Sequence, residues 1–380
     1  MYNGHMKRYI ENQITEDLKK KMVFITGPRQ VGKTYLSKQI RALYDKSVYL
    51  NYDSVDDSKV IRSREWPLEN KFIILDELHK MKGWKNYLKG VFDTRPEHQS
   101  FLVTGSARLD TFRKTGDSLS GRYFAYRLNP LSVKELAGSM KPFDALNALN
   151  RLGGFPEPFL SGSEDFAGRW RAQYYTDLVR DDILEFSRID EIRSMKLLLE
   201  LLRRGVASPI SYANLAGDLQ ISPVTVKKYL EILEALFIII IVKPFHRNIA
   251  RSILKEPKVY FYDSGYVDGD EGVKLENTFA VSLLKHIQYL QDIKGAELSL
   301  NYLKTKDGRE IDFVITEKGE VKTFIEVKLS DQNISKDLRY FKDKYQKAQA
   351  VQAVHNLRQA RESEGIQVAH AGEVLEGLEA

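Results

Sequence analysis

The segment Gly27–Thr34 constrains the fold more than any other part of the chain. It reads Gly-Pro-Arg-Gln-Val-Gly-Lys-Thr and matches G-x-x-x-x-G-K-[ST] at every fixed position. The apolar segment Lys21–Thr26 precedes it and predicts a strand, and Lys33–Leu43 has the pattern of a helix. A loop of this kind between a strand and a helix is the setting in which the motif binds phosphate. We therefore predict a P-loop, and a chance match in a glycine-containing turn is the alternative.

The motif residues have distinct expected tasks. Glycines let the backbone wrap closely around a phosphate, and the loop N–H groups together with the helix N-terminus attract the anion. Lys33 is expected to reach the β- and γ-phosphates of ATP, and Thr34 is expected to ligate Mg²⁺. ATP and Mg²⁺ are accordingly the expected cofactors.

A second element supports the first. The apolar segment Phe72–Leu75 predicts a strand, and it is followed directly by Asp76 and Glu77. Asp76 would hold the magnesium through water, and Glu77 would orient and deprotonate the attacking water. A strand that merely ends in two solvated acids is the alternative.

Three further residues are candidates for contact with the transferred phosphate. Thr104 ends the next expected strand and would contact the γ-phosphate or the attacking water, although a plain strand end is an equal alternative. A transition state with charge on the γ-phosphate needs a cation. Arg122 and Arg108 are candidates for this role, in cis or in trans to a neighbouring subunit, against the alternative of solvated surface arginines. The expected nucleotide-binding residues are Gly27, Pro28, Arg29, Gln30, Val31, Gly32, Lys33, Thr34, Asp76 and Thr104.

The order of apolar and amphipathic segments predicts the domain organisation. Five short apolar runs alternate with helical patterns in the first part of the chain, which is typical of a parallel α/β sheet. We predict a P-loop core over residues 1–130, a helical lid over 131–192, a winged helix over 193–246 and a second α/β domain over 247–380. With 380 residues, about two to four units are expected.

The expected winged helix follows from the order helix, helix, turn, helix, strand. Its third helix opens at Ser222 and Pro223, with serine as N-cap and proline at the first helical position. Val226, Leu230 and Leu233 are expected to pack inward, and Thr225, Lys227 and Lys228 to face a nucleic acid. A protein-docking surface is the alternative, because two lysines make a weak basic footprint.

A hairpin near the C-terminus carries the second set of candidate residues. Residues 309–329 alternate in polarity about a Lys-Gly turn, and folding symmetrically about Gly319 places Asp312 opposite Glu326. Lys328 shares a strand face with Glu326. Facing carboxylates repel unless a cation lies between them, so Mg²⁺ is expected here, with Lys328 beside a scissile phosphate. Glu276 would add a third acid from the helix expected to start at Leu275, and a solvated, charge-paired hairpin is the alternative.

Composition limits the remaining possibilities. The chain has no cysteine, which excludes disulfides and thiolate zinc sites, and its net charge of +6 permits an anionic partner. The longest apolar run, Ala235–Val242, is far shorter than the ~20 residues that cross a bilayer, so no membrane association is expected. Since the polar N-terminus has no secretory segment, the cytoplasm is the expected location.

Several motifs together resemble a known family. The P-loop, Leu-Asp-Glu-Leu-His, Thr-Gly-Ser-Ala, Leu-Ser-Gly-Arg, Leu-Asn-Pro-Leu-Ser and Gly-Gly-Phe-Pro-Glu resemble prokaryotic AAA-type (AAA+) ATPases with a winged-helix segment and a C-terminal restriction-endonuclease-like domain of the PD-(D/E)xK kind. The resemblance implies that Lys33, Thr34, Asp76 and Glu77 form the ATP site. It also places Asp312, Glu326, Lys328 and Glu276 at nuclease-type positions, with Ile311 where such motifs often have proline.

Three functions are compatible with the sequence. The first is an ATP-driven protein that acts on DNA through the winged helix and the nuclease-like domain. The second is a nucleotide-switched regulatory or signalling ATPase whose C-terminal domain only binds a protein or DNA partner. The third is a transcription-type DNA-binding module with ATP as a ligand. The acid–acid–lysine set favours the first, because the other two do not need it.

Overall fold

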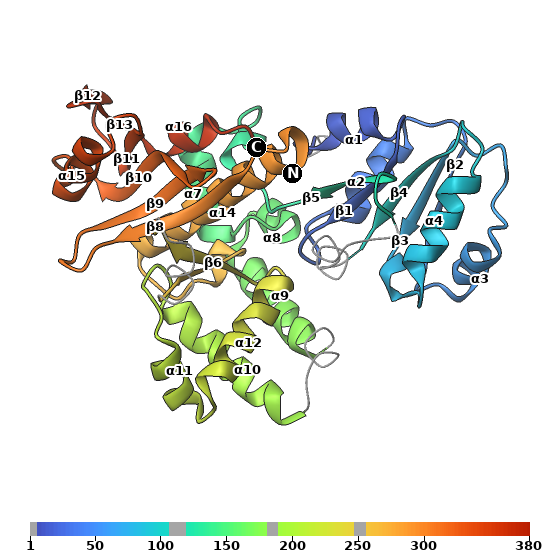
Figure 1. Cartoon of the computed structure of the whole chain (residues 1–380), viewed down its shortest axis with the longest axis horizontal. Helices are drawn as coiled ribbons and strands as arrows, with labels where there is room; N and C mark the ends of the chain where they lie inside the picture. The colour runs from blue at the N-terminus through green and yellow to red at the C-terminus, as the bar shows by residue number, and fades with distance from the viewer. Residues whose placement is uncertain (1–5, 106–118, 181–188, 247–255) are drawn as a thin grey trace. The chain divides into compact units, whose positions relative to one another are not determined.

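The computed structural model describes residues 6–105, 119–180, 189–246 and 256–380 (Figure 1). The chain divides into two compact units. The first extends to Asn129, and the second comprises most of the chain from Pro130 onward, with the short segment Ala235–Phe237 grouped with the first. The expected lid, the three-helix segment and the C-terminal α/β region therefore all fall within one unit.

The first unit is built on a parallel sheet. Its strand order among the described residues is β2-β3-β4-β1-β5, so β4 lies between β1 and β3. The strands are β1 (Met22–Thr26), β2 (Ser47–Asn51), β3 (Phe72–Asp76), β4 (Ser100–Thr104) and β5 (Tyr123–Arg127). The helical elements are α1 (Glu11–Asp17), α2 (Lys33–Arg41), α3 (Val55–Ser63), the 3-10 helix η1 (Leu78–Lys80) and α4 (Trp84–Thr94).

Continuous apolar runs explain why β1 and β3 are central strands. Every residue of both strands is buried, as expected for a parallel sheet that is covered on both faces. Trp84 and Leu88 of α4 and Ile61 of α3 pack with strand residues in one core. The sheet thereby fixes where the carboxyl ends of β1, β3 and β4 lie.

The second unit combines helices with a larger mixed sheet. Its helical elements are α6 (Val133–Leu136), α7 (Pro142–Leu152), α8 (Pro156–Ser161), α9 (Glu164–Leu178), α10 (Ile189–Arg204), α11 (Tyr212–Leu219), α12 (Pro223–Ala235), η4 (Ser264–Tyr266), α14 (Glu271–Lys294), α15 (Lys336–Lys344) and α16 (Ala371–Glu376). The strands are β6 (Ile239–Pro244), β7 (Lys258–Phe261), β8 (Leu298–Lys304), β9 (Glu310–Glu317), β10 (Glu320–Ser330), β11 (Gln349–Asn356), β12 (Arg361–Ser363) and β13 (Ile366–His370).

The sheet of the second unit has the order β12-β13-β11-β10-β9-β8-β6-β7 among the described residues. Strand β6 pairs with β7 in antiparallel and with β8 in parallel orientation. The two strands that follow the three-helix segment therefore belong to the same sheet as the C-terminal hairpin. Helix α14 packs on β8 and β10, and α15 packs on β9, β10 and β11.

The hairpin β9–β10 folds about the expected Lys-Gly turn. Lys318 and Gly319 both have positive φ, at 50° and 79°. The register shifts between Val321 and Thr323, and beyond that irregularity Phe324 pairs with Val314 and Ile325 with Phe313. Continuing this register by one residue places Glu326 opposite Asp312.

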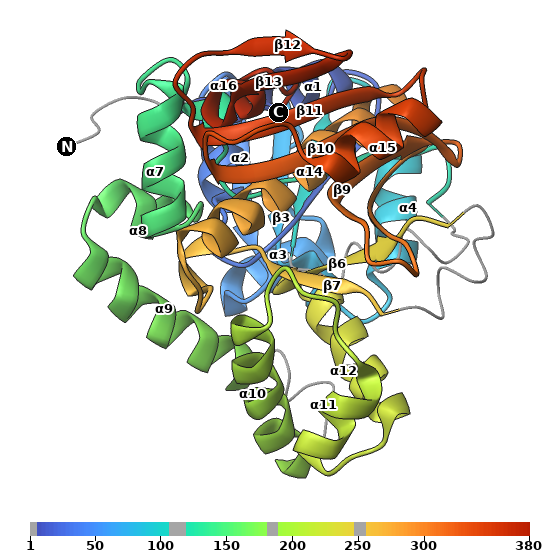
Figure 2. The ribbon, with the colours of Figure 1, turned by 90° about the vertical axis from the view of Figure 1, so that its left-hand side faces the viewer.

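The helices α10, α11 and α12 lie close together beside β6 and β7 (Figures 1 and 2). The backbone N–H of Thr225 donates a 3.1 Å hydrogen bond to the Ser222 hydroxyl, which is the expected N-cap of α12. Val226, Leu230 and Leu233 are buried, whereas Lys227 and Lys228 are exposed. The segment thus has the inward and outward faces that the sequence indicates.

One helix starts earlier than the sequence analysis expects. Helix α14 begins at Glu271 rather than at Leu275, because the Asp270 side chain accepts a 2.9 Å hydrogen bond from the N–H of Val273 and caps the helix. Of the helices that the structure describes, none is both long and apolar enough to cross a membrane.

Candidate nucleotide site and carboxylate cluster

The loop after β1 adopts a backbone that depends on glycine. Gly27 has φ 141° and Gly32 has φ 99°. A Cβ atom on Gly27 would lie 2.2 Å from the carbonyl oxygen of Leu128, a distance that no real Cβ contact reaches. The close approach of two backbone segments therefore requires glycine at this position.

Lys33 begins α2 and folds back over the loop. Its side chain is buried, and its Nζ donates hydrogen bonds to the carbonyls of Gly27, at 3.0 Å, and Pro28, at 2.6 Å. The expected phosphate-binding ammonium thus lies against the loop that it would serve.

The Asp76 carboxylate accepts hydrogen bonds from hydroxyl groups of two neighbouring strands and of the first turn of α2. The Thr34 hydroxyl donates to Oδ2 at 3.1 Å, and the Tyr49 hydroxyl donates to the same oxygen. The Thr104 hydroxyl donates to Oδ1. The structure therefore brings Thr34, Asp76 and Thr104 together, and Tyr49 is an additional member that sequence reasoning missed.

Glu77 follows directly and has an unusual backbone. Its φ of 56° lies in the left-handed region, which is uncommon for a residue other than glycine. Its N–H donates to the carbonyl of Thr104 at 3.0 Å, which fixes it beside the sheet edge. Burial, and then the nearby charge of Asp76, raise the pKa of the Glu77 carboxyl. A raised pKa brings a carboxylate closer to the basicity that proton transfer at neutral pH requires.

The arginine candidates have different positions. Arg122 is paired with Asp93 of α4 through two contacts, Nε to Oδ1 at 2.7 Å and Nη2 to Oδ2 at 3.0 Å. This pairing lowers the pKa of Asp93, chiefly through the hydrogen bond. A role in stabilising a transition state would require Arg122 to leave Asp93. Arg108 lies outside the described residues.

Arg8 is a residue of this site that the sequence analysis did not anticipate. It is only 3% exposed, and its guanidinium donates to the carbonyl of Val31 in the P-loop at 2.8 Å and to the carbonyl of Asn129 at 2.5 Å. Arg8 thus ties the P-loop to the segment that follows β5. No local motif marks it, since the carbonyls of Val31 and Asn129 are distant from it in sequence.

The hairpin of the second unit brings three predicted residues together. Asp312 Oδ2 accepts a 2.8 Å hydrogen bond from the N–H of Val327, and the Lys328 ammonium lies 2.8 Å from Glu326 Oε1. Within the described part of the chain, the other oxygen of Glu326, Oε2, is buried without a hydrogen-bond partner.

A buried lysine lies among the same carboxylates. Lys258 of β7 is 1% exposed, and its Nζ lies 2.7 Å from Glu310, 3.3 Å from Glu276 and 4.0 Å from Asp312. The Tyr260 hydroxyl also donates to Glu276, at 2.7 Å. We call Glu276, Glu310, Asp312, Glu326, Lys258 and Lys328 the carboxylate cluster. The sequence analysis missed Lys258, Glu310 and Tyr260, although Glu310 shares a strand face with Asp312 by the two-residue period.

The amide of Asn277 explains how α14 presents Glu276 to the cluster. Asn277 is fully buried, accepts a 2.8 Å hydrogen bond from the N–H of Phe261 and donates a 2.8 Å hydrogen bond to its carbonyl. The Asn277 amide thus joins α14 to β7 by pairing with both backbone groups of Phe261, as a neighbouring strand would. It places the preceding residue, Glu276, next to Lys258 and Tyr260.

Burial and mutual repulsion shape the charges of the cluster. Burial and the charge of Asp312 raise the pKa of Glu276 to about 7, against the opposing effects of Lys258 and Tyr260. Burial and Asp312 likewise raise the pKa of Glu326 to about 7. Burial alone would lower the pKa of Lys258, but the surrounding carboxylates raise it overall. Burial and the mutual repulsion of the carboxylates therefore both favour a bound cation or proton at the cluster.

The cluster differs from the expected three-acid magnesium site. In the described ranges, no three His, Cys, Asp or Glu side chains are gathered closely enough to hold a metal ion. Glu276 is instead engaged by Lys258 and Tyr260. The unpartnered Oε2 of Glu326 and the all-oxygen donors fit one hard divalent cation, since Mg²⁺ is commonly held by one or two carboxylates and water.

Comparisons with known proteins agree with the geometry of the first unit. Residues 19–137 match the AAA domain family. The first unit has the AAA-type P-loop fold. That fold supports binding and hydrolysis of ATP. Residues 144–268 and 271–373 match two families described as domains of unknown function, DUF8612 and DUF4143.

Two curated relatives match most of this chain. A protein of Mycobacterium tuberculosis, described as uncharacterised, is 24% identical over 326 residues, which are 84% of this chain and 73% of that protein. An uncharacterised protein of Methanocaldococcus jannaschii is 24% identical over 358 residues, covering 84% of this chain and 78% of the relative.

Solved structures give similarities at low identity. A Walker-type ATPase of Pyrococcus abyssi is 16% identical and covers 71% of this chain and 96% of its own, with a TM-score of 0.43. A variant of Thermotoga maritima RuvB is 16% identical and covers 60% of this chain and 86% of its own, with a TM-score of 0.30.

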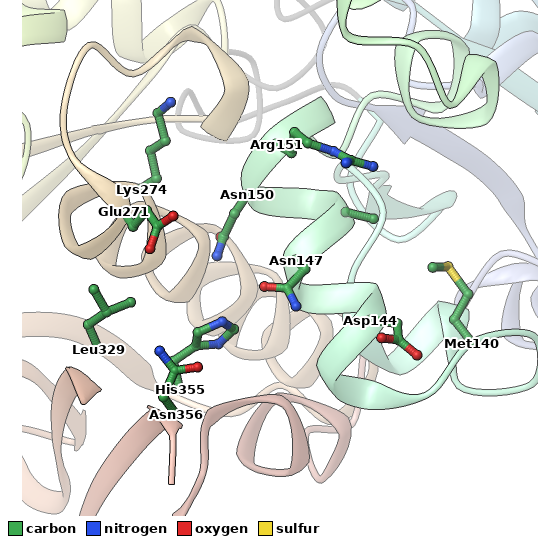
Figure 3. A pocket seen from close by; sticks show the side chains of 11 residues that line it. Met140, Asp144, Asn147, Asn150, Arg151, Glu271, Lys274, Leu329, His355 and Asn356 are labelled. Atoms are coloured by element: carbon green, nitrogen blue, oxygen red, sulfur yellow. The ribbon is translucent and has the colours of Figure 1, made fainter. Parts of the chain in front are cut away.

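The second unit also contains a cavity of about 590 Å³ (Figure 3). It is lined from α7 by residues that include Asp144, Asn147 and Arg151, and from the first turn of α14 by Glu271 and Lys274. The ends of β10 and β11 complete the wall. None of the residues that line this cavity belongs to the carboxylate cluster.

Proposed function

We propose that the chain binds ATP at Gly27–Thr34, hydrolyses it with Glu77 as the base, and uses the hydrolysis to act on DNA. The convergence of Thr34 and Thr104 on Asp76 carries this proposal, because it places a P-loop hydroxyl and a strand-end carboxylate in contact. Glu77, with its raised pKa, follows immediately.

The donors at this site suit magnesium. The Thr34 hydroxyl and the Asp76 carboxylate face each other, and both are oxygen ligands of the kind that Mg²⁺ prefers. When bound, Mg²⁺ would neutralise charge on the β- and γ-phosphates. Lys33 would turn from the carbonyls of Gly27 and Pro28 toward those phosphates, and Glu77 would accept a proton from the attacking water.

Action on DNA has independent support from the second unit. Lys227 and Lys228 are exposed on α12, the third helix of a helix-helix-turn-helix order. The carboxylate cluster adds residues of the type used in phosphodiester chemistry. A nucleotide-switched ATPase whose second unit only binds a protein partner is the alternative.

Cleavage of a phosphodiester bond is a second candidate activity. The buried, unpartnered Oε2 of Glu326 and the ammonium of Lys328, 2.8 Å from Oε1 of the same residue, favour it. Asp312 and Glu326 would hold one divalent cation, which would polarise the scissile phosphate. Lys328 would stabilise charge that develops beside it.

The deciding experiment for the main proposal measures ATP hydrolysis with and without single-stranded, duplex and branched DNA. We expect magnesium-dependent turnover that at least one DNA form stimulates, and none in Lys33→Ala. Turnover that no DNA form alters would support the protein-partner alternative. The absence of any turnover would contradict the assignment of the ATP site.

Cleavage is tested separately. Labelled DNA is incubated with Mg²⁺ or Mn²⁺ and with wild type, Asp312→Ala or Lys328→Ala. Metal-dependent cleavage that both substitutions abolish supports the activity. If no substrate is cut and calorimetry detects no metal at the cluster, the second unit is a binding module.

A further inference from the structure

The carboxylate cluster contains a cation that the fold itself supplies. The Lys258 ammonium touches Glu310 and Glu276 and lies 4.0 Å from Asp312, and its side chain is 2% exposed. Its Nζ also lies 5.4 Å from the centre of the Tyr302 ring, within the range of a cation–π contact. Buried lysines are rare unless they are paired, and this one has several anionic partners at once.

The backbone holds this lysine firmly in place. Lys258 is paired with Val242 in the β6–β7 ladder and forms a bridge with Pro209 on its other side. The neighbouring Tyr260 and the Asn277 contact with Phe261 fix β7 against α14. The ammonium is therefore positioned by a sheet, unlike an exchangeable ion.

The lysine ammonium groups offset part of the negative charge of the cluster. Its four carboxylates, those of Glu276, Glu310, Asp312 and Glu326, face the ammonium groups of Lys258 and Lys328. With every group of the cluster ionised, two negative charges remain. A single divalent cation would bring the cluster to neutrality, whereas two divalent cations would leave two positive charges. Lys304 lies 2.8 Å from Glu310 at the exposed edge of the cluster, outside this count.

We propose that Lys258 takes the place of one divalent cation in the carboxylate cluster, so that the cluster accepts a single ion, held by Asp312 and Glu326. Lys258 is then a positioning residue that holds Glu276 and Glu310 away from this ion. This inference rests on the proposed cleavage function and defines its metal requirement.

The test measures metal binding rather than cleavage. The full chain is used without nucleotide or DNA, in an Asp76→Asn background that removes the expected magnesium ligand of the P-loop. Mn²⁺ binding is followed by calorimetry, and the melting temperature is measured with and without Mn²⁺. Lys258→Met is compared with Lys258→Arg, which keeps the charge, and with Lys304→Met, which removes an equal charge from the edge of the cluster.

The expected results separate a built-in cation from mere packing. The Asp76→Asn protein with Lys258 intact should bind one Mn²⁺ per chain. Lys258→Met should melt lower without metal, recover in Mn²⁺, and bind Mn²⁺ with about tenfold higher affinity or take up a second ion, because a fixed positive charge has gone. Lys258→Arg should keep one ion, and Lys304→Met should change little because its ammonium is solvated.

Several outcomes would overturn the inference. They are two ions bound by the chain with Lys258 intact, no Mn²⁺ binding by any of the variants, or a loss of stability in Lys258→Met that Mn²⁺ does not recover. If Lys258→Met does not fold, Lys258→Met combined with Glu310→Gln restores the charge balance and should fold without metal. Failure of that double variant also counts against the charge role. Since no DNA is present, a lack of cleavage activity leaves these results readable.

Discussion

The hydroxyl of Thr34 donates a 3.1 Å hydrogen bond to the carboxylate of Asp76, although 42 positions separate the two residues. The bond joins the first turn of α2 to the end of β3. Strand β4, which lies between β1 and β3 in the sheet, contributes the hydroxyl of Thr104 to the same carboxylate. Because the carboxyl ends of parallel strands lie at one edge of a sheet, Thr34, Asp76 and Thr104 come together although they are distant in sequence. This arrangement leads to the first two predictions.

Replacing Lys33 with alanine should abolish tight ATP binding. The ammonium is the one side-chain cation that the P-loop motif directs at the β- and γ-phosphates, and a small apolar residue cannot replace it. Binding of a fluorescent ATP analogue and steady-state hydrolysis would both be measured. Lys20→Ala, an exposed lysine of the same unit, is the control and should behave like wild type. Unchanged turnover in Lys33→Ala would show that the loop has been misassigned.

Glu77→Gln should separate ATP binding from hydrolysis. The amide keeps the shape of the side chain but cannot accept the proton of the attacking water, so turnover should fall roughly 10²–10⁴-fold while ATP affinity is retained. Equilibrium binding and single-turnover hydrolysis provide the two measurements. Glu69→Gln, at an exposed position, is the matched control. A parallel loss of affinity would instead indicate that Glu77 is structural or a magnesium ligand.

Residues whose role is carried by a local pattern could be predicted from sequence. The P-loop, the strand that ends at Asp76 and the hairpin turn at Lys318–Gly319 each show a local signal, namely motif spacing, a continuous apolar run or alternation about a turn. The structure confirms the parallel α/β sheet that the alternation of apolar and amphipathic segments predicts for the first unit. The pairing of Asp312 with Glu326 also follows, because the register beyond the bulge is symmetric about Gly319.

Residues that act through distant contacts could not be predicted in this way. Arg8 donates to carbonyls 23 and 121 positions away, and no spacing rule connects them. Lys258 reaches Glu310 from a strand on the far side of β8 in the sheet order. The start of α14 was different, because Asp270 is a recognisable N-cap that the apolar pattern beginning at Leu275 concealed.

Arg8→Ala should destabilise the first unit and weaken ATP binding. The buried guanidinium satisfies the carbonyls of Val31 and Asn129, and hydrogen bonds from a charged group are worth about 1.5–3 kcal/mol each. Arg8→Lys should also be impaired, because an ammonium lacks the fork geometry that reaches both carbonyls. Chemical denaturation and ATP titration measure the two effects, with Lys7→Ala as an exposed control. A stable Arg8→Ala protein with wild-type ATP affinity would show that the contact has no role in the loop.

The last prediction concerns α12. If this helix meets DNA, Lys227→Ala combined with Lys228→Ala should weaken binding of all sequences, because lysines on an exposed helix face contact phosphates more often than bases. The buried Val226, Leu230 and Leu233 are untouched, so the fold should persist.

Affinity for duplex DNA would be measured at several salt concentrations. Each lost phosphate contact should reduce the slope of log affinity against log salt by about 1. An exposed pair elsewhere in the second unit, Lys318→Ala with Lys347→Ala, controls for the change in net charge. If the α12 variant keeps both the affinity and the slope of wild type while the control pair also has no effect, α12 is a protein-docking surface. DNA would then have to be bound elsewhere, because a phosphate contact cannot be removed without altering counterion release.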